Sequence, residues 1–185
     1  MLHVGSRSDP SVLRLVVIVI GVLLTVVYTM ISLATSDWLW FSQEFSETPR
    51  AVVVHCHGET VNFDPGSYHF KALTELMNKS LSGRKNWDSL TLSAETYQDY
   101  QTDPQMIAVE FFYATPVRVH SSYKYYSNVD NLVVPLEGRH AQTNAVFGQN
   151  QGTPTAGALH VESTTPFKEY LNNQKICPVE LSNNQ

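Results

Sequence analysis

Residues 15–33 contain no charged side chain, and this constrains the fold more than any other feature of the chain. The segment reads LVVIVIGVLLTVVYTMISL, and Ala34 extends it to 20 residues. At about 1.5 Å per residue, a helix of that length spans the roughly 30 Å hydrocarbon layer of a bilayer. Such a helix satisfies its own backbone hydrogen bonds, as lipid requires. Residues 15–36 are therefore predicted to form a transmembrane signal-anchor helix.

The charges on either side predict how this helix is oriented. Arg7 and Arg14 precede it, whereas the first charged residue after it is Asp37. Positive charges are retained on the cytoplasmic side of a membrane. We therefore expect residues 1–14 to be a short cytoplasmic tail and the C-terminal domain to be extracytoplasmic, in a single-pass membrane protein. A cleaved signal peptide is the alternative, although its apolar region is usually only about 7–15 residues long.

Small and hydroxyl-bearing residues recur on one face of the predicted helix. They are three or four positions apart: Gly21, Thr25, Thr29 and Ser32. A stripe of this kind lets a second helix approach closely and offers it hydrogen bonds. In the alternative, each hydroxyl simply bonds to a carbonyl of its own helix. The stripe thus predicts a transmembrane interface with another membrane protein.

Composition excludes several function classes. The formal net charge is −5 and no basic run is present, so a nucleic-acid partner is not expected. Two cysteines are too few for a disulfide-rich mini-protein or a four-cysteine zinc module. The chain also contains no G-x-S-x-G, no H-E-x-x-H and no phosphate loop. No catalytic motif and no cofactor are therefore predicted.

The rest of the chain is predicted to be a small α+β domain. Residues 37–50 are polar and form a juxtamembrane tether, the domain covers residues 51–176, and residues 177–185 form a flexible C-terminal tail. Apolar residues at helical spacing predict one main packed helix over residues 66–82. β-branched and aromatic runs predict a mostly antiparallel sheet with strands at 51–56, 106–114, 117–126, 132–136, 145–149 and 158–162. Shorter helices are expected from near Ser93 and from Thr165.

The string His55-Cys56-His57-Gly58-Glu59 is the most suggestive for chemistry. If it is one strand, then His55, His57 and Glu59 share a face. Two imidazoles and a carboxylate can bind zinc or another divalent metal. The alternative is that Cys56 faces the core with its apolar neighbours and that the histidines lie on a partly solvated face.

The two cysteines, Cys56 and Cys177, both lie in the predicted external segment. In an oxidising compartment such a pair predicts a disulfide that fastens the C-terminal tail to the first strand. Two independent thiols remain the alternative.

A dense run of aromatic residues gives a candidate partner-binding surface at Tyr123, Tyr125 and Tyr126. Tyrosine is enriched at protein interfaces because it buries a large area at little cost in rotamer entropy. Cross-strand packing inside the sheet is the alternative.

The layout resembles the YycH/YycI-type membrane-anchored regulators. The matching features are the anchor at Leu15–Leu33, its stripe of small residues, and the run LVVPLEG…NAVFGQN…GALHVES followed by Phe167-Lys-Glu-Tyr-Leu. This resemblance implies association with a two-component sensor kinase through the transmembrane helix and the external domain.

Three functions are compatible with these patterns. The first is a non-catalytic, membrane-anchored protein whose external domain binds a protein partner or an envelope ligand and regulates a membrane sensor or complex. The second is a structural accessory subunit of a larger membrane complex. The third is a metal-binding or enzymatic external domain that uses His55, His57 and Glu59.

Overall fold

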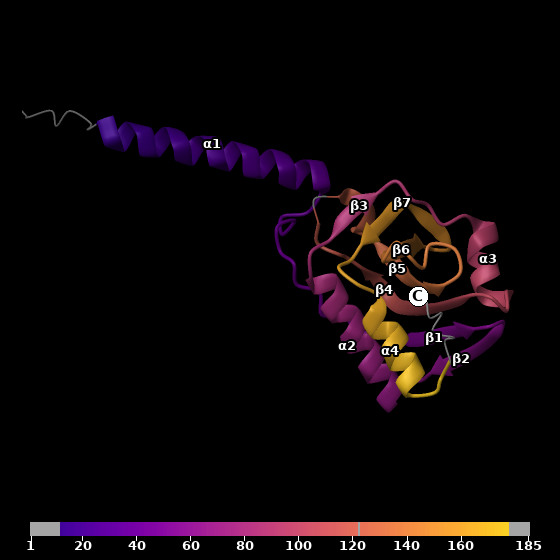
Figure 1. Ribbon diagram of the computed structural model, residues 1–185. Coiled ribbons are helices and arrows are strands. Elements are labelled where there is room, and N and C mark those ends of the chain that lie inside the picture. The colour runs from indigo at the N-terminus through magenta and orange to yellow at the C-terminus, as the bar shows by residue number, and fades with distance from the viewer. Residues whose placement is uncertain (1–11, 122, 178–185) are drawn as a thin grey trace, which may run out of the picture.

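A computed structural model describes residues 12–121 and 123–177 (Figure 1). Most of the predicted cytoplasmic tail, with Arg7, and residues 178–185 lie outside the described residues. Helix α1 (Val12–Thr35) extends away from a folded domain. It has a mean hydropathy of 2.7 and is the one described helix that is long and apolar enough to cross a membrane.

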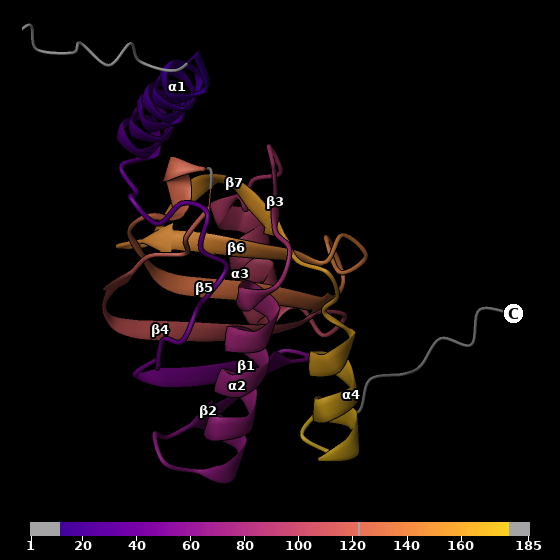
Figure 2. The same cartoon turned by 90° about the vertical axis from the view of Figure 1, so that its left-hand side faces the viewer.

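The folded domain contains a seven-stranded antiparallel sheet in the order β2-β1-β4-β5-β6-β7-β3. Figure 2 shows the strands stacked with the β7 end near α1 and β2 far from it. The predicted α+β class is confirmed. The strands are β1 (Ala51–Cys56), β2 (Glu59–Phe63), β3 (Asn86–Asp88), β4 (Ile107–Val117), β5 (Val129–Glu137), β6 (Ala145–Asn150) and β7 (Thr153–His160).

Two strands were not expected, and one predicted strand is not formed in the described residues. The strands β2 and β3 lie at the two edges of the sheet, and none of their residues is fully buried. The predicted strand over 117–126 is wrong, because β4 ends at Val117 and the chain folds back on itself. The amide of Val119 donates to the carbonyl of Tyr126 (2.8 Å), which ends a short 3₁₀ turn, η1 (Lys124–Tyr126).

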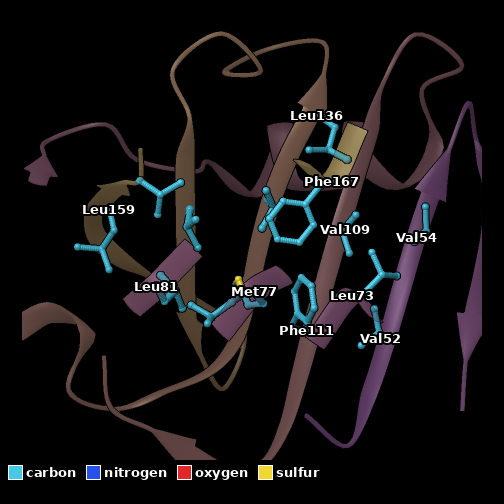
Figure 3. Packing of buried hydrophobic residues seen from close by; sticks show 14 of the residues in the cluster. Val52, Val54, Leu73, Met77, Leu81, Val109, Phe111, Leu136, Leu159 and Phe167 are labelled. Carbon is cyan, nitrogen blue, oxygen red and sulfur yellow. The ribbon is translucent and has the colours of Figure 1, made fainter. Parts of the chain in front are cut away.

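The main core lies between one face of the sheet and two helices, α2 (Tyr68–Ser82) and α4 (Thr165–Asn173). In α2 the buried positions follow the predicted helical spacing, and the Ser67 hydroxyl caps the helix by accepting from the amide of Phe70. The ring of Phe111 on β4 meets that of Phe167 on α4 edge to face. Figure 3 shows these side chains interleaved with residues of the helices and strands.

The opposite face of the sheet is covered in part by α3 (Ala94–Thr102). This helix begins after Ser93, as predicted, and the Ser93 hydroxyl accepts from the amide of Thr96. The buried side chain of Tyr100 packs here with Leu92 and Phe147. The sheet is thus enclosed on two sides, and its β1–β2 hairpin ends beside the C-terminal end of α3.

Candidate functional site

The predicted metal ligands His55, His57 and Glu59 do not share a face. The strand stops at Cys56, because His57 and Gly58 have φ of 54° and 85° and form a tight turn. Glu59 then begins β2 directly opposite Cys56. Since opposite residues of an antiparallel pair project to the same side, Glu59 lies on the face away from His55. The assumption that one strand runs through all three residues is wrong.

His55 instead belongs to a buried polar network under α3. Its Nε2 lies 3.5 Å from Oε1 of Glu110, and its Nδ1 lies 3.2 Å from the hydroxyl of Thr60. Glu110 is fully buried and accepts a hydrogen bond from Tyr97 (3.2 Å). Burial and the Glu110 carboxylate raise the pKa of Tyr97 to about 12, so this phenol stays protonated and donates.

The network continues across the sheet through two amide side chains. Asn131 Nδ2 donates to the Tyr97 hydroxyl (3.4 Å) and to Oε1 of Gln149 (3.2 Å). Sequence reasoning missed this network, although a single glutamate in the apolar run MIAVEFFYA was a signal. Because His55, Glu110, Asn131 and Gln149 are all buried, we assign this network to fold specification rather than to contact with a ligand.

The structure joins Cys56 and Cys177 in a disulfide, with Cα atoms 5.8 Å apart. Cys177 is fully buried, so the C-terminal tail does not begin at residue 177 as predicted. A ring nitrogen of His57 and both sulfur atoms lie within 4.8 Å of one another. The bridge therefore fastens the chain after α4 to the end of β1, beside an imidazole.

The helical stripe divides into two parts. The hydroxyls of Thr25 and Thr29 donate to the carbonyls of Gly21 (2.8 Å) and Thr25 (2.7 Å), and this part of α1 is exposed. Ser32, near the end of α1 that adjoins the folded domain, is only 1% exposed. Ser32 is therefore not accessible to a second helix, whereas Gly21, Thr25 and Thr29 keep their place in the predicted interface.

Ion pairs and a hydrogen bond connect the end of α1 to the folded domain. Asp37 is 6% exposed, and its carboxylate lies 2.9 Å from Nδ1 of His120 and 3.9 Å from Arg118. Arg118 also donates to the carbonyl of Ser36, which has φ of 54° and ends the helix. We call Ser36, Asp37, Arg118 and His120 the junction cluster. The segment predicted as a juxtamembrane tether thus begins as a fixed connection.

The same segment is fastened again further along. Phe45 is buried, and both its amide and its carbonyl bond to the hydroxyl of Ser82 at 3.0 Å. The ammonium of Lys85 donates to three carbonyls, those of Leu81, Gly83 and Gln43. Burial lowers the pKa of Lys85. A cavity of about 290 Å³ lies between this segment and His120, but Lys85 has no free donor to offer it.

The predicted tyrosine surface is corrected at one position and extended at another. Tyr126 is fully buried, and its hydroxyl donates to carbonyl oxygens of the β6–β7 pair, so it belongs to the core. Tyr123 and Tyr125 instead stack on Trp87 of β3, each with ring centroids 5.9 Å apart. We call Trp87, Tyr123 and Tyr125 the aromatic cluster. Figure 2 shows η1, which carries Tyr125, beside the end of α1.

No family model, no curated protein and no solved structure matches this chain.

Loss of the Asp37 carboxylate is expected to loosen the connection between α1 and the domain. In Asp37→Ala, His120 and Arg118 lose their shared partner, at a cost of about 1–3 kcal/mol. Because the native cysteines are bridged, spin labels can be attached at Leu24→Cys and Glu75→Cys and their separation measured by pulsed electron paramagnetic resonance in detergent. We expect a broader distance distribution for Asp37→Ala and no change for the control Glu44→Ala, whose side chain is exposed. An unchanged distribution in Asp37→Ala would contradict the assigned role of the junction cluster.

Proposed function

We propose that this chain is a single-pass membrane protein, with an inside N-terminus, whose external domain binds a membrane-protein partner without catalysing a reaction. The observation that carries the proposal is the junction cluster. A buried carboxylate with a histidine and an arginine partner holds the domain in one position at the end of α1. A flexible tether would let the domain adopt many distances and orientations relative to the bilayer. This fixed connection instead presents one set of domain surfaces close to the bilayer.

The aromatic cluster is the surface that this arrangement presents to a partner. Tyr125 is 42% exposed and its ring stacks on Trp87, and η1, the turn that carries it, lies beside the end of α1 (Figure 2). Lys124 adds a cation 5.7 Å from the centroid of the Tyr125 ring. Tyrosine and tryptophan are among the residue types most enriched at the centres of protein interfaces.

The exposed stripe on α1 supports a partner that is itself in the membrane. Gly21 leaves open space beside the helix, since an added Cβ would have no neighbour within 4 Å. With Thr25 and Thr29 it offers a second helix a close approach. The resemblance to YycH/YycI-type regulators suggests a sensor kinase as the class of partner.

Photo-crosslinking from two tyrosine positions tests this proposal. A photoreactive phenylalanine analogue replaces either Tyr125, next to α1, or Tyr68, which is 70% exposed at the start of α2. After irradiation of intact membranes, we expect a discrete protein adduct from position 125 and none from position 68. Thr25→Leu with Thr29→Leu is expected to lower the yield of that adduct severalfold. Adducts with lipid alone, or equal protein adducts from both positions, would contradict the proposal.

A further inference from the structure

Two cysteines and a histidine from distant parts of the chain meet at the closed end of the β1–β2 hairpin. Cys56 ends β1, His57 forms the turn, and Cys177 follows α4. Their ligand atoms, two sulfurs and one ring nitrogen, lie within 4.8 Å of one another. Two thiolates and an imidazole are a donor set that zinc prefers.

The position of His57 does not depend on the disulfide. Its backbone amide donates to the carbonyl of Met106 (3.1 Å), and its Nδ1 donates to the carbonyl of Pro104 (2.7 Å). A carbonyl oxygen only accepts, so Nδ1 carries the proton and Nε2 keeps its lone pair in the neutral ring. Histidines that bind metals are oriented in the same way, by donation from the second nitrogen to a carbonyl or carboxylate.

The turn that presents His57 is itself restrained. His57 adopts φ of 54°, a left-handed conformation that is uncommon for residues other than glycine, asparagine and aspartate. Gly58 follows with φ of 85°, and a Cβ at that position would lie 3.1 Å from the carbonyl oxygen of Thr102. The hairpin turn thus packs against the end of α3, and the imidazole is held beside the sulfurs by the protein backbone.

We propose that Cys56, His57 and Cys177 form a redox-controlled zinc site. In the oxidised state the sulfurs are bonded to each other, so neither is a thiolate that can bind a metal. Reduction yields two thiols next to an imidazole that is already in position. Three protein ligands leave one coordination position for water or an exogenous group. This proposal is independent of the partner-binding function.

The chemistry balances when a dithiol or two molecules of a small thiol act as the reductant. The reductant gives two electrons and two protons to the disulfide and becomes a disulfide itself, which leaves Cys56 and Cys177 as thiols. Zinc then displaces one proton from each thiol, and the two sulfur–zinc bonds form while two protons are released. Reoxidation to the disulfide would expel the metal.

The test compares oxidised and reduced full-length protein in mild detergent. After reduction with a phosphine and its removal without oxygen, the protein receives Zn²⁺ and is passed through a desalting column. Elemental analysis is expected to find one zinc per reduced chain and none per oxidised chain. Co²⁺ in place of zinc is expected to give thiolate charge-transfer absorption. At a hundredfold excess of free Zn²⁺ over its Kd, the unfolding midpoint of the reduced protein should rise by about 5–10 °C.

The variant His57→Asn is the specific control, because asparagine tolerates the left-handed backbone but is a poor ligand for zinc. It is expected to weaken zinc binding by at least about tenfold. His140→Asn, at another left-handed position with φ of 66°, is expected to change nothing. If reduction unfolds the domain, zinc should restore the folded circular dichroism spectrum of the wild type but not of His57→Asn. Absence of zinc uptake, equal affinity in His57→Asn, or equal uptake by the oxidised protein would overturn the proposal.

Discussion

Replacement of both Cys56 and Cys177 by alanine is expected to lower the free energy of unfolding by about 4–5 kcal/mol, because the disulfide closes a very long loop. The bridged residues are 121 positions apart, so the bridge removes many conformations from the unfolded chain. Alanine is preferred to serine, since both positions are buried and a hydroxyl there would lack a partner. The unfolding midpoint should fall by about 8–20 °C.

Thermal unfolding followed by circular dichroism, with a metal chelator present, measures this effect. The wild type treated with reductant serves as the matched comparison, and its midpoint should fall to that of the double alanine variant. Reductant should not change the midpoint of the variant, which has no bridge to lose. A midpoint within about 2 °C of the oxidised wild type would show that the bridge contributes little to stability.

The periodic elements of the fold were predictable from the sequence. The apolar segment that forms α1, the spacing that forms α2 and the cap at Ser93 each depend on residues close together in the chain. Such local patterns decide which face of an element becomes apolar. The edge strands β2 and β3 were missed because they bury little and are held by their neighbours rather than by a pattern of their own.

The candidate sites were less predictable, because single backbone angles and tertiary contacts decide them. The left-handed conformation of His57 turns the chain one residue after β1 and places the imidazole with the cysteines instead of with His55. No local sequence pattern predicts that Tyr126 is buried in the core while its neighbour Tyr125 remains exposed. The role of Asp37 depends on His120, 83 positions later in the chain.

The two ends of the domain are fixed by different means. The junction cluster holds the N-terminal end with charged hydrogen bonds, and the disulfide holds the C-terminal end covalently. The aromatic cluster lies near the junction cluster at the N-terminal end, and the proposed zinc site lies at the disulfide at the C-terminal end. Reduction of the disulfide in the absence of zinc would therefore release the chain after α4 while the junction at α1 stays in place.

Substitution of Gly157 by alanine is expected to detach β3 from the sheet. Gly157 has φ of 92°, and a Cβ there would overlap the carbonyl oxygen of Asp88 and the indole of Trp87. Left-handed backbone costs alanine about 1–2 kcal/mol, and overpacking costs about 1–3 kcal/mol more. The three-residue strand β3 is the part that can move away, because it pairs only with β7 at the edge of the sheet.

Hydrogen exchange with mass spectrometry measures this detachment directly. In Gly157→Ala the amides of residues 86–88 should exchange at least tenfold faster, and the bond from Trp87 Nε1 to the carbonyl of Ala156 should be lost. The control is Gly66→Ala, which has nearly the same φ, 96°, but no neighbour within 4 Å of the added Cβ. The Gly66→Ala variant should lose only the free energy that left-handed backbone costs alanine, and its β3 amides should exchange at the normal rate. Normal exchange at residues 86–88 in Gly157→Ala would contradict the expected detachment of β3.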